Sequence, residues 1–436
     1  MSQIDHRARP QRALVVHPAR GERSASRTPS ERLTEAVGLA EALDLQVAHA
    51  LVSPLRTLSP ATFFGSGRVN EIGELCRTFE IELVVVDDHL GPVQQRNLER
   101  AWSVKVIDRT GLILEIFGRR ARTAEGRLQV ELARLEYERS RLVRTWTHLE
   151  RQRGGFGFLG GPGETQIEAD RRLLVERIVK LKADLADVRR TRELQRRGRK
   201  RVPYPIVALV GYTNAGKSTL FNRLTSAEVF AKSMLFATLD PTLRRLRLPG
   251  GRDAILSDTV GFISDLPHEL VEAFRATLDE VREADLVLHV RDISSADSEA
   301  QQQDVAVVLE TLGVGEGSGR RVLEVWNKID LVSSGRREEL AADARRRGAV
   351  LVSAETGEGR ETLLSRIGEL LDAYPEKAFH LTADDGEGLA WLYRHGRVVE
   401  RRQTEEGLEI IARLDPQALR RFEQMRPGRV WSLAAE

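Results

Sequence analysis

The chain has 436 residues, which is enough for about three folding units of ordinary size. Apolar residues make up 41% of it, a share that is ordinary for a globular protein and excludes a wholly disordered chain. The single cysteine, Cys76, excludes intramolecular disulfides and metal sites built from several cysteines. No apolar run is long enough to suggest a membrane span. We therefore expect a cytoplasmic protein, with a peripheral membrane-associated fraction left open.

The net charge of +2 hides an uneven distribution along the chain. Residues 119–201 hold 20 Arg and 3 Lys against 9 Glu and 3 Asp, a net charge of +11 that leaves −9 for the rest. Clustered cations attract polyanions such as nucleic acids, because phosphates release counterions when they bind them. A solvated helix surface in an arginine-rich protein is the alternative interpretation.

Residues 1–118 are predicted to form an N-terminal α/β domain. Short apolar runs at 13–16 and 83–86 are typical of buried strands, and residues 31–43 show helical periodicity. The segment 18–30 is rich in Arg, Ser and Pro, and we expect it to be a mobile loop. A further short apolar run over 112–117 closes the unit.

A basic helical hairpin is predicted over residues 119–202. Apolar residues recur at heptad spacing over 128–149 and again over 167–188, the pattern of two helices that pack along one seam. Two helices joined by a short connection fold back as an antiparallel hairpin. At 1.5 Å per residue, the arm would be about 36 Å long.

The connection between these helices, 151–164, is rich in glycine and carries more apolar side chains than helix closure requires. Aromatic rings, flexible glycines and arginines suit stacking on unpaired bases and contact with phosphates. A tip that folds back on its own core is the alternative. The candidate RNA-contacting residues of this tip are Phe156, Phe158, Leu159, Arg151 and Arg153.

Residues 203–375 are predicted to form a nucleotide-binding domain. An apolar strand at 206–210 leads into Gly211-Tyr-Thr-Asn-Ala-Gly-Lys-Ser and then a helix, which is G-x₄-G-K-S in its strand–loop–helix context. The loop turns main-chain N–H groups toward phosphates, Lys217 would reach the β- and γ-phosphates, and the Ser218 hydroxyl would bind Mg²⁺. The phosphate-binding candidates are Gly211, Tyr212, Thr213, Asn214, Ala215, Gly216, Lys217, Ser218 and Thr219.

Two later segments indicate that the base is guanine. A strand at 323–326 ends in Asn-Lys-Ile-Asp, and the carboxylate of Asp330 can accept from N1 and from the 2-amino group that adenine lacks. A strand at 350–352 leads to Ser353-Ala354, whose main chain can contact the guanine O6. The guanine-binding candidates are Asn327, Lys328, Ile329, Asp330, Ser353, Ala354 and Glu355.

Two segments between these motifs are candidate switches. The first comprises Phe236, Ala237, Thr238, Leu239 and Asp240, and the second comprises Asp258, Thr259, Val260 and Gly261. Asp258 would hold the Mg²⁺ shell through water, and the Gly261 amide would contact the γ-phosphate. A switch I threonine, Thr238 or Thr242, would bind Mg²⁺ only in the triphosphate state. Thr242 can instead serve a turn after Pro241.

The chain resembles the HflX family, within the Obg–HflX group of translation-factor-like GTPases. N-A-G-K-S-T, F-A-T-L-D-P, D-T-V-G-F and N-K-I-D match the group, and G-P-G-E-T-Q-I-E-A-D-R-R at 161–172 points to HflX itself. D-R-T-G-L-I-L from Asp108 and Q-Q-R-N-L from Gln94 also match, so that the resemblance covers about 13–373. The family's T-L-x-P pattern favours Thr238 over Thr242.

The resemblance implies a GTPase that binds the large ribosomal subunit and separates stalled ribosomes, with the hairpin tip against ribosomal RNA near the peptidyl-transferase centre. Its usual tip reads G-G-x-G-x-R-G-P-G-E, whereas this one reads G-G-F-G-F-L-G-G-P-G-E. The arginine is missing, and we therefore expect apolar and stacking contacts to replace charge at the tip.

Two further positions bear on hydrolysis. Many GTPases place a glutamine directly after D-x-x-G to orient the attacking water, but this chain has Phe262 there. Unassisted hydrolysis should therefore be slow, and ribosomal RNA or protein should supply the missing group. Asn214 occupies the P-loop position at which related enzymes hold K⁺, although the same side chain could brace a switch.

The predicted fold class is α/β. A P-loop GTPase domain with a doubly wound, mostly parallel sheet follows the N-terminal α/β domain and its long antiparallel helical hairpin. A small α/β tail over 376–436 follows, with strands near 379–382 and 409–412.

The expected cofactors are Mg²⁺ and K⁺, with GTP as substrate. We expect a monomer whose partners are the large ribosomal subunit and GTP or GDP. An RNA-remodelling enzyme and a signalling GTPase with a coiled-coil arm are the alternatives.

Overall fold

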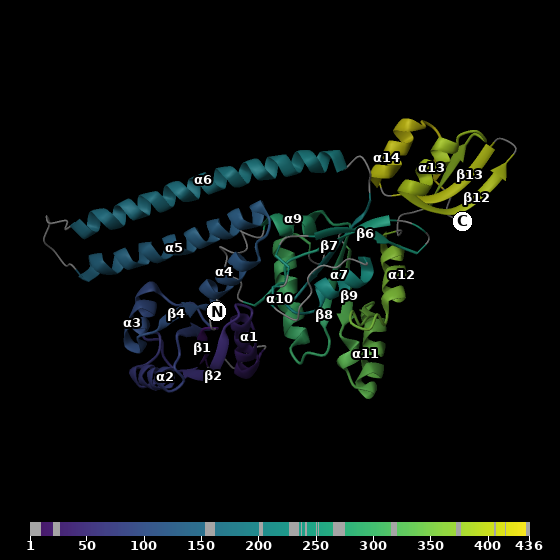
Figure 1. Ribbon diagram of the computed structural model, residues 1–436. Helices are drawn as coiled ribbons and strands as arrows, with labels where there is room; N and C mark the ends of the chain where they lie inside the picture. The colour runs from purple at the N-terminus through teal and green to yellow at the C-terminus, as the bar shows by residue number, and fades with distance from the viewer. Residues whose placement is uncertain are drawn as a thin grey trace, which may run out of the picture.

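A computed structural model describes residues 10–20, 27–152, 162–199, 204–225, 235–236, 238–239, 242–249, 251, 253–264, 275–314, 321–371, 376–404, 407–414 and 416–432. The described elements form three β-sheets with their covering helices and one long helical hairpin (Figure 1). The predicted α/β class is confirmed.

The first sheet and its helices make up the N-terminal region. Its four strands are all parallel, in the order β2-β1-β3-β4. The strands are β1 (Arg12–Arg20), β2 (Gln46–Leu55), β3 (Leu83–Val86) and β4 (Lys105–Asp108). The helices are α1 (Pro29–Glu41), α2 (Ser66–Thr78), α3 (Pro92–Trp102) and α4 (Arg109–Arg120). The strands predicted at 13–16 and 83–86 lie within β1 and β3. The loop expected over 18–30 is wrong at both ends, because residues 18–20 belong to β1 and α1 begins at Pro29; residues 21–26 lie outside the described residues.

The apolar run at 112–117 forms the middle of helix α4. The helix begins where it does because the side chain of Asp108 accepts from the main-chain N–H of Gly111 at 2.8 Å, which caps its first turn. Six residues of the run are too few to tell a strand from a buried helix by periodicity alone. Phe117, near the end of α4, is fully buried.

The hairpin consists of α5 (Ala124–Gln152) and α6 (Pro162–Arg199), which run side by side past the first sheet (Figure 1). Ile178, Leu181 and Leu185 of α6 are buried along the predicted seam. On α5 the buried residues Val130 and Ala133 lie off the predicted stripe, because this helix also packs against α4.

Both helices extend into the segment that we expected to be loop. Arg151 belongs to α5, and α6 begins at Pro162, a residue suited to the first helical position because its missing N–H would be unpaired there in any case. With 38 residues, α6 is about 57 Å long, longer than the predicted arm. Arg153, Phe156, Phe158 and Leu159 lie outside the described residues.

The second sheet is doubly wound, in the order β10-β9-β8-β5-β7-β6, and only β6 is antiparallel to its neighbour. Its strands are β5 (Ile206–Gly211), β6 (Thr242–Arg247), β7 (Asp253–Asp258), β8 (Leu286–Asp292), β9 (Arg321–Asn327) and β10 (Val350–Leu351). The helical elements are α7 (Lys217–Thr225), α9 (Arg275–Glu283), α10 (Ser298–Thr311), η1 (Ile329–Leu331), α11 (Ser334–Arg347) and α12 (Arg360–Leu371). The strands predicted at 206–210, 323–326 and 350–352 correspond to β5, β9 and β10.

The third sheet forms a small C-terminal domain. It is antiparallel, in the order β12-β13-β11-β14, and two helices cover it. The elements are β11 (Glu376–Leu381), α13 (Gly386–His395), β12 (Gly396–Thr404), β13 (Gly407–Leu414), α14 (Pro416–Met425) and β14 (Val430–Ser432). The domain has its own core, in which the rings of Phe379 and Phe422 meet edge to face at 5.0 Å.

None of the helices that the structure describes combines the length and the apolar character needed to cross a membrane.

Candidate nucleotide-binding site

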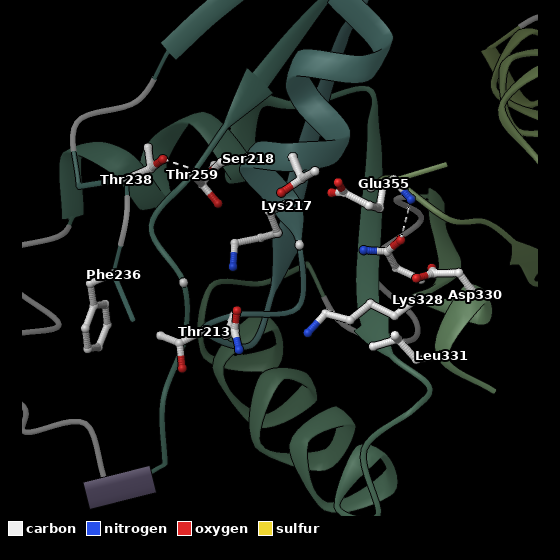
Figure 2. Close-up of a pocket in the computed structure, with 16 residues that line it drawn as sticks. Thr213, Lys217, Ser218, Phe236, Thr238, Thr259, Lys328, Asp330, Leu331 and Glu355 are labelled. Carbon is white, nitrogen blue, oxygen red and sulfur yellow. Dashed lines mark hydrogen bonds between the residues drawn. The ribbon is translucent and has the colours of Figure 1, made fainter. Parts of the chain in front are cut away.

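The P-loop joins β5 to α7 at the carboxyl edge of the second sheet (Figure 2). Gly216 has a φ of 90°, and a Cβ added there would lie 2.2 Å from Nδ2 of Asn327, so that glycine is required. Asn214 has a φ of 60°, a conformation that asparagine tolerates better than most residues. The loop borders a cavity of about 380 Å³, which is large enough for a small ligand.

Lys217 points into this cavity (Figure 2). Its Nζ donates to the carbonyl oxygen of Tyr212 at 2.8 Å and to that of Gly211 at 3.1 Å. Burial lowers the pKa of Lys217 to about 8, because the charged ammonium is removed from water. A phosphate anion in the cavity would favour the charged form again.

Three side-chain oxygens from separate segments meet beside the P-loop. The hydroxyls of Ser218 and Thr238 donate to Oδ2 of Asp258 at 2.7 and 2.9 Å. The two hydroxyls lie 2.8 Å from each other (Figure 2). Oδ1 of Asp258 is buried and has no hydrogen-bond partner among the described residues. Burial raises the pKa of this carboxyl group. An all-oxygen group with an unsatisfied buried carboxylate atom fits a hard divalent cation such as Mg²⁺.

The opposite end of the cavity lies at the carboxyl ends of β9 and β10. Nδ2 of Asn327 donates to the carbonyl oxygen of Ala215 at 2.8 Å, and its Oδ1 accepts from the main-chain N–H of Ala354 at 2.9 Å. Arg223 on α7 donates from Nε to the carbonyl oxygen of Ala354 at 3.1 Å. Asn327 thus connects the P-loop to the loop after β10.

The side chains of Lys328 and Asp330 border the same end of the cavity (Figure 2). Nζ of Lys328 donates to Oδ2 of Asp292 at 2.7 Å, which fixes the lysine stem along one wall. Asp330 lies in the short helix η1 directly after Lys328. A carboxylate at this wall can accept two N–H groups from one edge of a planar base.

Switch II is connected to the P-loop through main-chain hydrogen bonds. The N–H of Thr213 donates to the carbonyl oxygen of Phe262 at 2.7 Å, and the N–H of Phe262 donates to that of Gly211 at 3.0 Å. A Cβ on Gly261 would lie 3.0 Å from Nζ of Lys217, which favours glycine there. The ring of Phe262 is buried in the apolar core and carries no group that could orient a water molecule.

The cavity brings most of the predicted nucleotide-binding residues together. Those that line it are Thr213, Asn214, Gly216, Lys217, Ser218, Thr219, Phe236, Thr238, Thr259, Gly261, Asn327, Lys328, Asp330, Ala354 and Glu355. The predicted residues that do not line it are Gly211, Tyr212, Ala215, Leu239, Asp258, Val260, Ile329 and Ser353. Ala237 and Asp240 lie outside the described residues.

The two switch threonines differ in position. Thr238 lines the cavity, whereas Thr242 is the first residue of β6 and pairs in register with Asp258. This geometry supports Thr238 as the metal-binding threonine.

Several residues that line or support the site were not predicted from the sequence. Leu331 lines the cavity beside the predicted guanine motif, Asp292 holds Lys328, and Arg223 holds the loop at Ala354. None of these residues has a motif of its own, and a single sequence gives no signal that would have found them.

The strand–loop–helix at Lys217, the oxygen group at Asp258 and the asparagine-braced base pocket together define a P-loop GTPase. Four family models match the chain: GTP-binding GTPase N-terminal over 30–118, GTP-binding GTPase Middle Region over 120–199, 50S ribosome-binding GTPase over 206–328, and HflX C-terminal domain over 339–425. The last match includes most of the tail over 376–436, which lies beyond the 13–373 covered by the motif resemblance.

Curated relatives agree with these matches. The chain is 50% identical to GTPase HflX of Magnetococcus marinus over 416 residues, 95% of either chain. It is 46% identical to GTPase HflX of Escherichia coli over 341 residues, 78% of this chain and 79% of that protein. The chain belongs to the HflX family of GTPases. A solved structure of a GTP-binding protein from Sulfolobus solfataricus in complex with GDP is 24% identical, covers 83% of this chain and 98% of its own, and has a TM-score of 0.45.

Proposed function

We propose that this GTPase binds the large ribosomal subunit in its GTP-bound form, separates stalled or idle ribosomes, and leaves after hydrolysis. The observation that carries the proposal is the basic hairpin of α5 and α6, whose two helices run side by side past the first sheet (Figure 1). The family description of residues 206–328 as a 50S ribosome-binding GTPase supports it. The protein would act as a monomer.

Helix α6 carries exposed cations beyond those that form ion pairs across the hairpin. Arg177 and Lys182 form ion pairs across the hairpin with Glu131 and Glu136, at 2.6 and 2.8 Å. Other cations of α6 are exposed and make no ion pair with any described residue: Arg171, Arg172, Lys180 and Arg190. Such side chains are suited to phosphate contacts, which position a protein on nucleic acid without reading its sequence.

The nucleotide would lie with its phosphates at the P-loop and its base at Asp330. Ser218 and Thr238 would hold Mg²⁺ directly and Asp258 would hold it through water, and the cation would neutralise charge on the β- and γ-phosphates. Thr238 reaches this position from switch I, so closure of switch I would accompany binding of the triphosphate. Asn214 would provide the K⁺ site.

Hydrolysis would need a group from outside the chain. Phe262 is buried and apolar, so switch II offers no side chain at that position to orient water. Ribosomal RNA or protein would supply it, which would couple hydrolysis to arrival on the particle.

The direct test is sedimentation with purified small and large subunits and intact ribosomes, in the presence of a non-hydrolysable GTP analogue or GDP. We expect comigration with large subunits in the analogue and loss of intact ribosomes. Binding to naked RNA with rearrangement of its structure would instead support the RNA-remodelling alternative. Failure to bind any ribosomal particle would support the signalling alternative.

A charge variant tests the role of the hairpin. Arg171→Gln combined with Arg172→Gln should weaken subunit binding and flatten its dependence on salt, because fewer phosphates would be neutralised. The matched control is Arg336→Gln with Arg345→Gln, which removes the same charge from exposed positions of α11. Equal losses in both variants would show that only overall charge matters.

A further inference from the structure

Phe236 of switch I packs against the N-terminal region. Its ring meets Phe117 of α4 edge to face, with centroids 4.7 Å apart and an interplanar angle of 82°. The preceding residue, Leu235, lies so close to α1 that a Cβ on Gly38 would be 3.3 Å from its Cδ1. Phe236 has a φ of 55°, an unfavourable conformation for a bulky residue. Contacts from outside the second sheet therefore hold this part of switch I.

A buried polar cluster lies at the same boundary. The hydroxyl of Tyr212 accepts from the guanidinium of Arg27 at 2.8 Å and from the main-chain N–H of Ser264 at 2.9 Å, and it donates to Glu35. Arg109 donates to the carbonyl oxygen of Ser264 at 3.1 Å and also to Glu35. The P-loop and the segment that follows switch II are thus both bonded to the N-terminal region.

The cluster occupies the place where open parallel sheets usually bind ligands. The chain leaves β1 toward β2 on one side and returns to β3 on the other, so the crevice lies at the carboxyl ends of β1 and β3. His17 and Asp87 meet there at 2.8 Å, and Arg109 donates to Asp87 at 2.6 Å. Arg109 donates both to Asp87 and to the carbonyl oxygen of Ser264. The main chain at Ser264 is therefore held where such a sheet would be expected to bind a ligand.

We propose that the N-terminal region is an internal recognition surface for the closed switch I, in which Phe117 packs against Phe236. Phe117 is then a positioning residue of the GTPase site. Only one residue separates Phe236 from Thr238, whose hydroxyl lies at Ser218 and Asp258. The position of one side chain therefore restricts the other. Docking of the N-terminal region and binding of the triphosphate should favour each other, since coupling between two binding events is reciprocal.

The test uses the full chain without ribosomes, so its outcome is independent of the proposed ribosomal function. The affinities of the β,γ-imido analogue of GTP and of GDP are measured by isothermal titration calorimetry in Mg²⁺ buffer for wild type and Phe117→Ala. We expect the analogue to bind about fivefold more weakly or worse and GDP to change less than twofold, because couplings between sites are commonly of that size.

The matched control is Phe64→Ala. Phe64 is 1% exposed, pairs edge to face with Phe63, and belongs to the core on the other face of the first sheet, away from the switches. The Phe64→Ala substitution should destabilise the N-terminal region without changing the ratio of the affinities for the GTP analogue and for GDP. An unchanged ratio in Phe117→Ala, or an equal change in Phe64→Ala, would overturn the proposal.

A second variant keeps the proposal testable if Phe117→Ala folds poorly. Phe236→Leu and Phe117→Leu each retain an apolar side chain, and the double variant completes a thermodynamic cycle. If the contact carries the coupling, the double variant should lose no more preference for the analogue than either single variant. Additive losses would show that the two rings act independently.

Discussion

The ammonium of Lys217 donates to the carbonyl oxygen of Tyr212 at 2.8 Å, within the P-loop itself. The lysine is buried, and its pKa is lowered to about 8. The carbonyl oxygens accept hydrogen bonds from the ammonium but do not neutralise its charge. Burial of this charge therefore lowers the free energy of unfolding, and a bound phosphate would offset that loss.

The first prediction concerns pH. The unfolded chain keeps the Lys217 proton up to about pH 10.5, so between pH 8 and 10.5 this group makes the free energy of unfolding rise with pH. Nucleotide binding should have the opposite dependence, because phosphates require the charged form. Calorimetric titrations at pH 8.5 in buffers of different ionisation enthalpy should detect proton uptake on GTP binding. Binding without uptake would contradict the lowered pKa.

The second prediction concerns Asn327→Ala. The substitution leaves the Ala215 carbonyl and the Ala354 N–H without their partner, at about 1–3 kcal/mol for each buried group. GTP and GDP should both bind at least about tenfold more weakly, with their ratio nearly unchanged, because the brace lies at the base end of the cavity. Fluorescent nucleotide titration measures both constants. A selective loss of GTP would place Asn327 in the switch mechanism instead.

The third prediction concerns the base. Asp330→Asn replaces the carboxylate that we expect to pair with N1 and the 2-amino group of guanine, which should weaken GTP by about 10- to 100-fold. Xanthosine triphosphate should gain affinity, because its C2 carbonyl can accept from the new amide. Competition between the two nucleotides gives the ratio directly. Unchanged GTP affinity would rule out Asp330 as the base-reading residue.

The fourth prediction concerns turnover. Large subunits should raise the GTPase rate at least about tenfold, because Phe262 provides no polar group for the attacking water. Phosphate release is measured in K⁺ and in Na⁺ buffer, with and without subunits. Asn214→Ala should remove any preference for K⁺. Equal turnover with and without subunits would contradict the prediction, and a wild type indifferent to the cation would end the K⁺ proposal.

The fifth prediction concerns the hairpin tip. Replacing 154–161 by a short Gly/Ser linker should abolish ribosome splitting, since stacking is worth about 1–3 kcal/mol per base and two aromatic residues are lost. Nucleotide affinity should persist, because the cavity is built from residues after Ile206. Splitting at the wild-type rate would show that the tip only closes the hairpin.

Local patterns made the nucleotide site predictable. The P-loop, the aspartate at Asp258 and the guanine motif are short runs that each end a strand, and a doubly wound sheet brings such strand ends to one edge. The order of the motifs along the chain was therefore enough to place them around one cavity.

Contacts between distant segments were not predictable in this way. Phe117 and Phe236 are far apart in the chain, and neither residue has a spacing that points to the other. The buried face of α5 was also missed, because heptad spacing shows that a helix packs but not how many neighbours it has. Tertiary packing decided both features.

The core that surrounds Phe236 has a consequence for how the protein can be divided. Leu112, Ile116 and Phe117 of α4 share one continuous apolar cluster with Phe236 and Phe262, so these switch residues are interior parts of a core that two sheets build together. A fragment that begins after the hairpin would expose those rings to water. It would therefore lack part of its hydrophobic core and would not fold as an independent domain. The C-terminal domain, which encloses its own core around Phe379, is the part of this chain that can be removed with least disturbance to the rest.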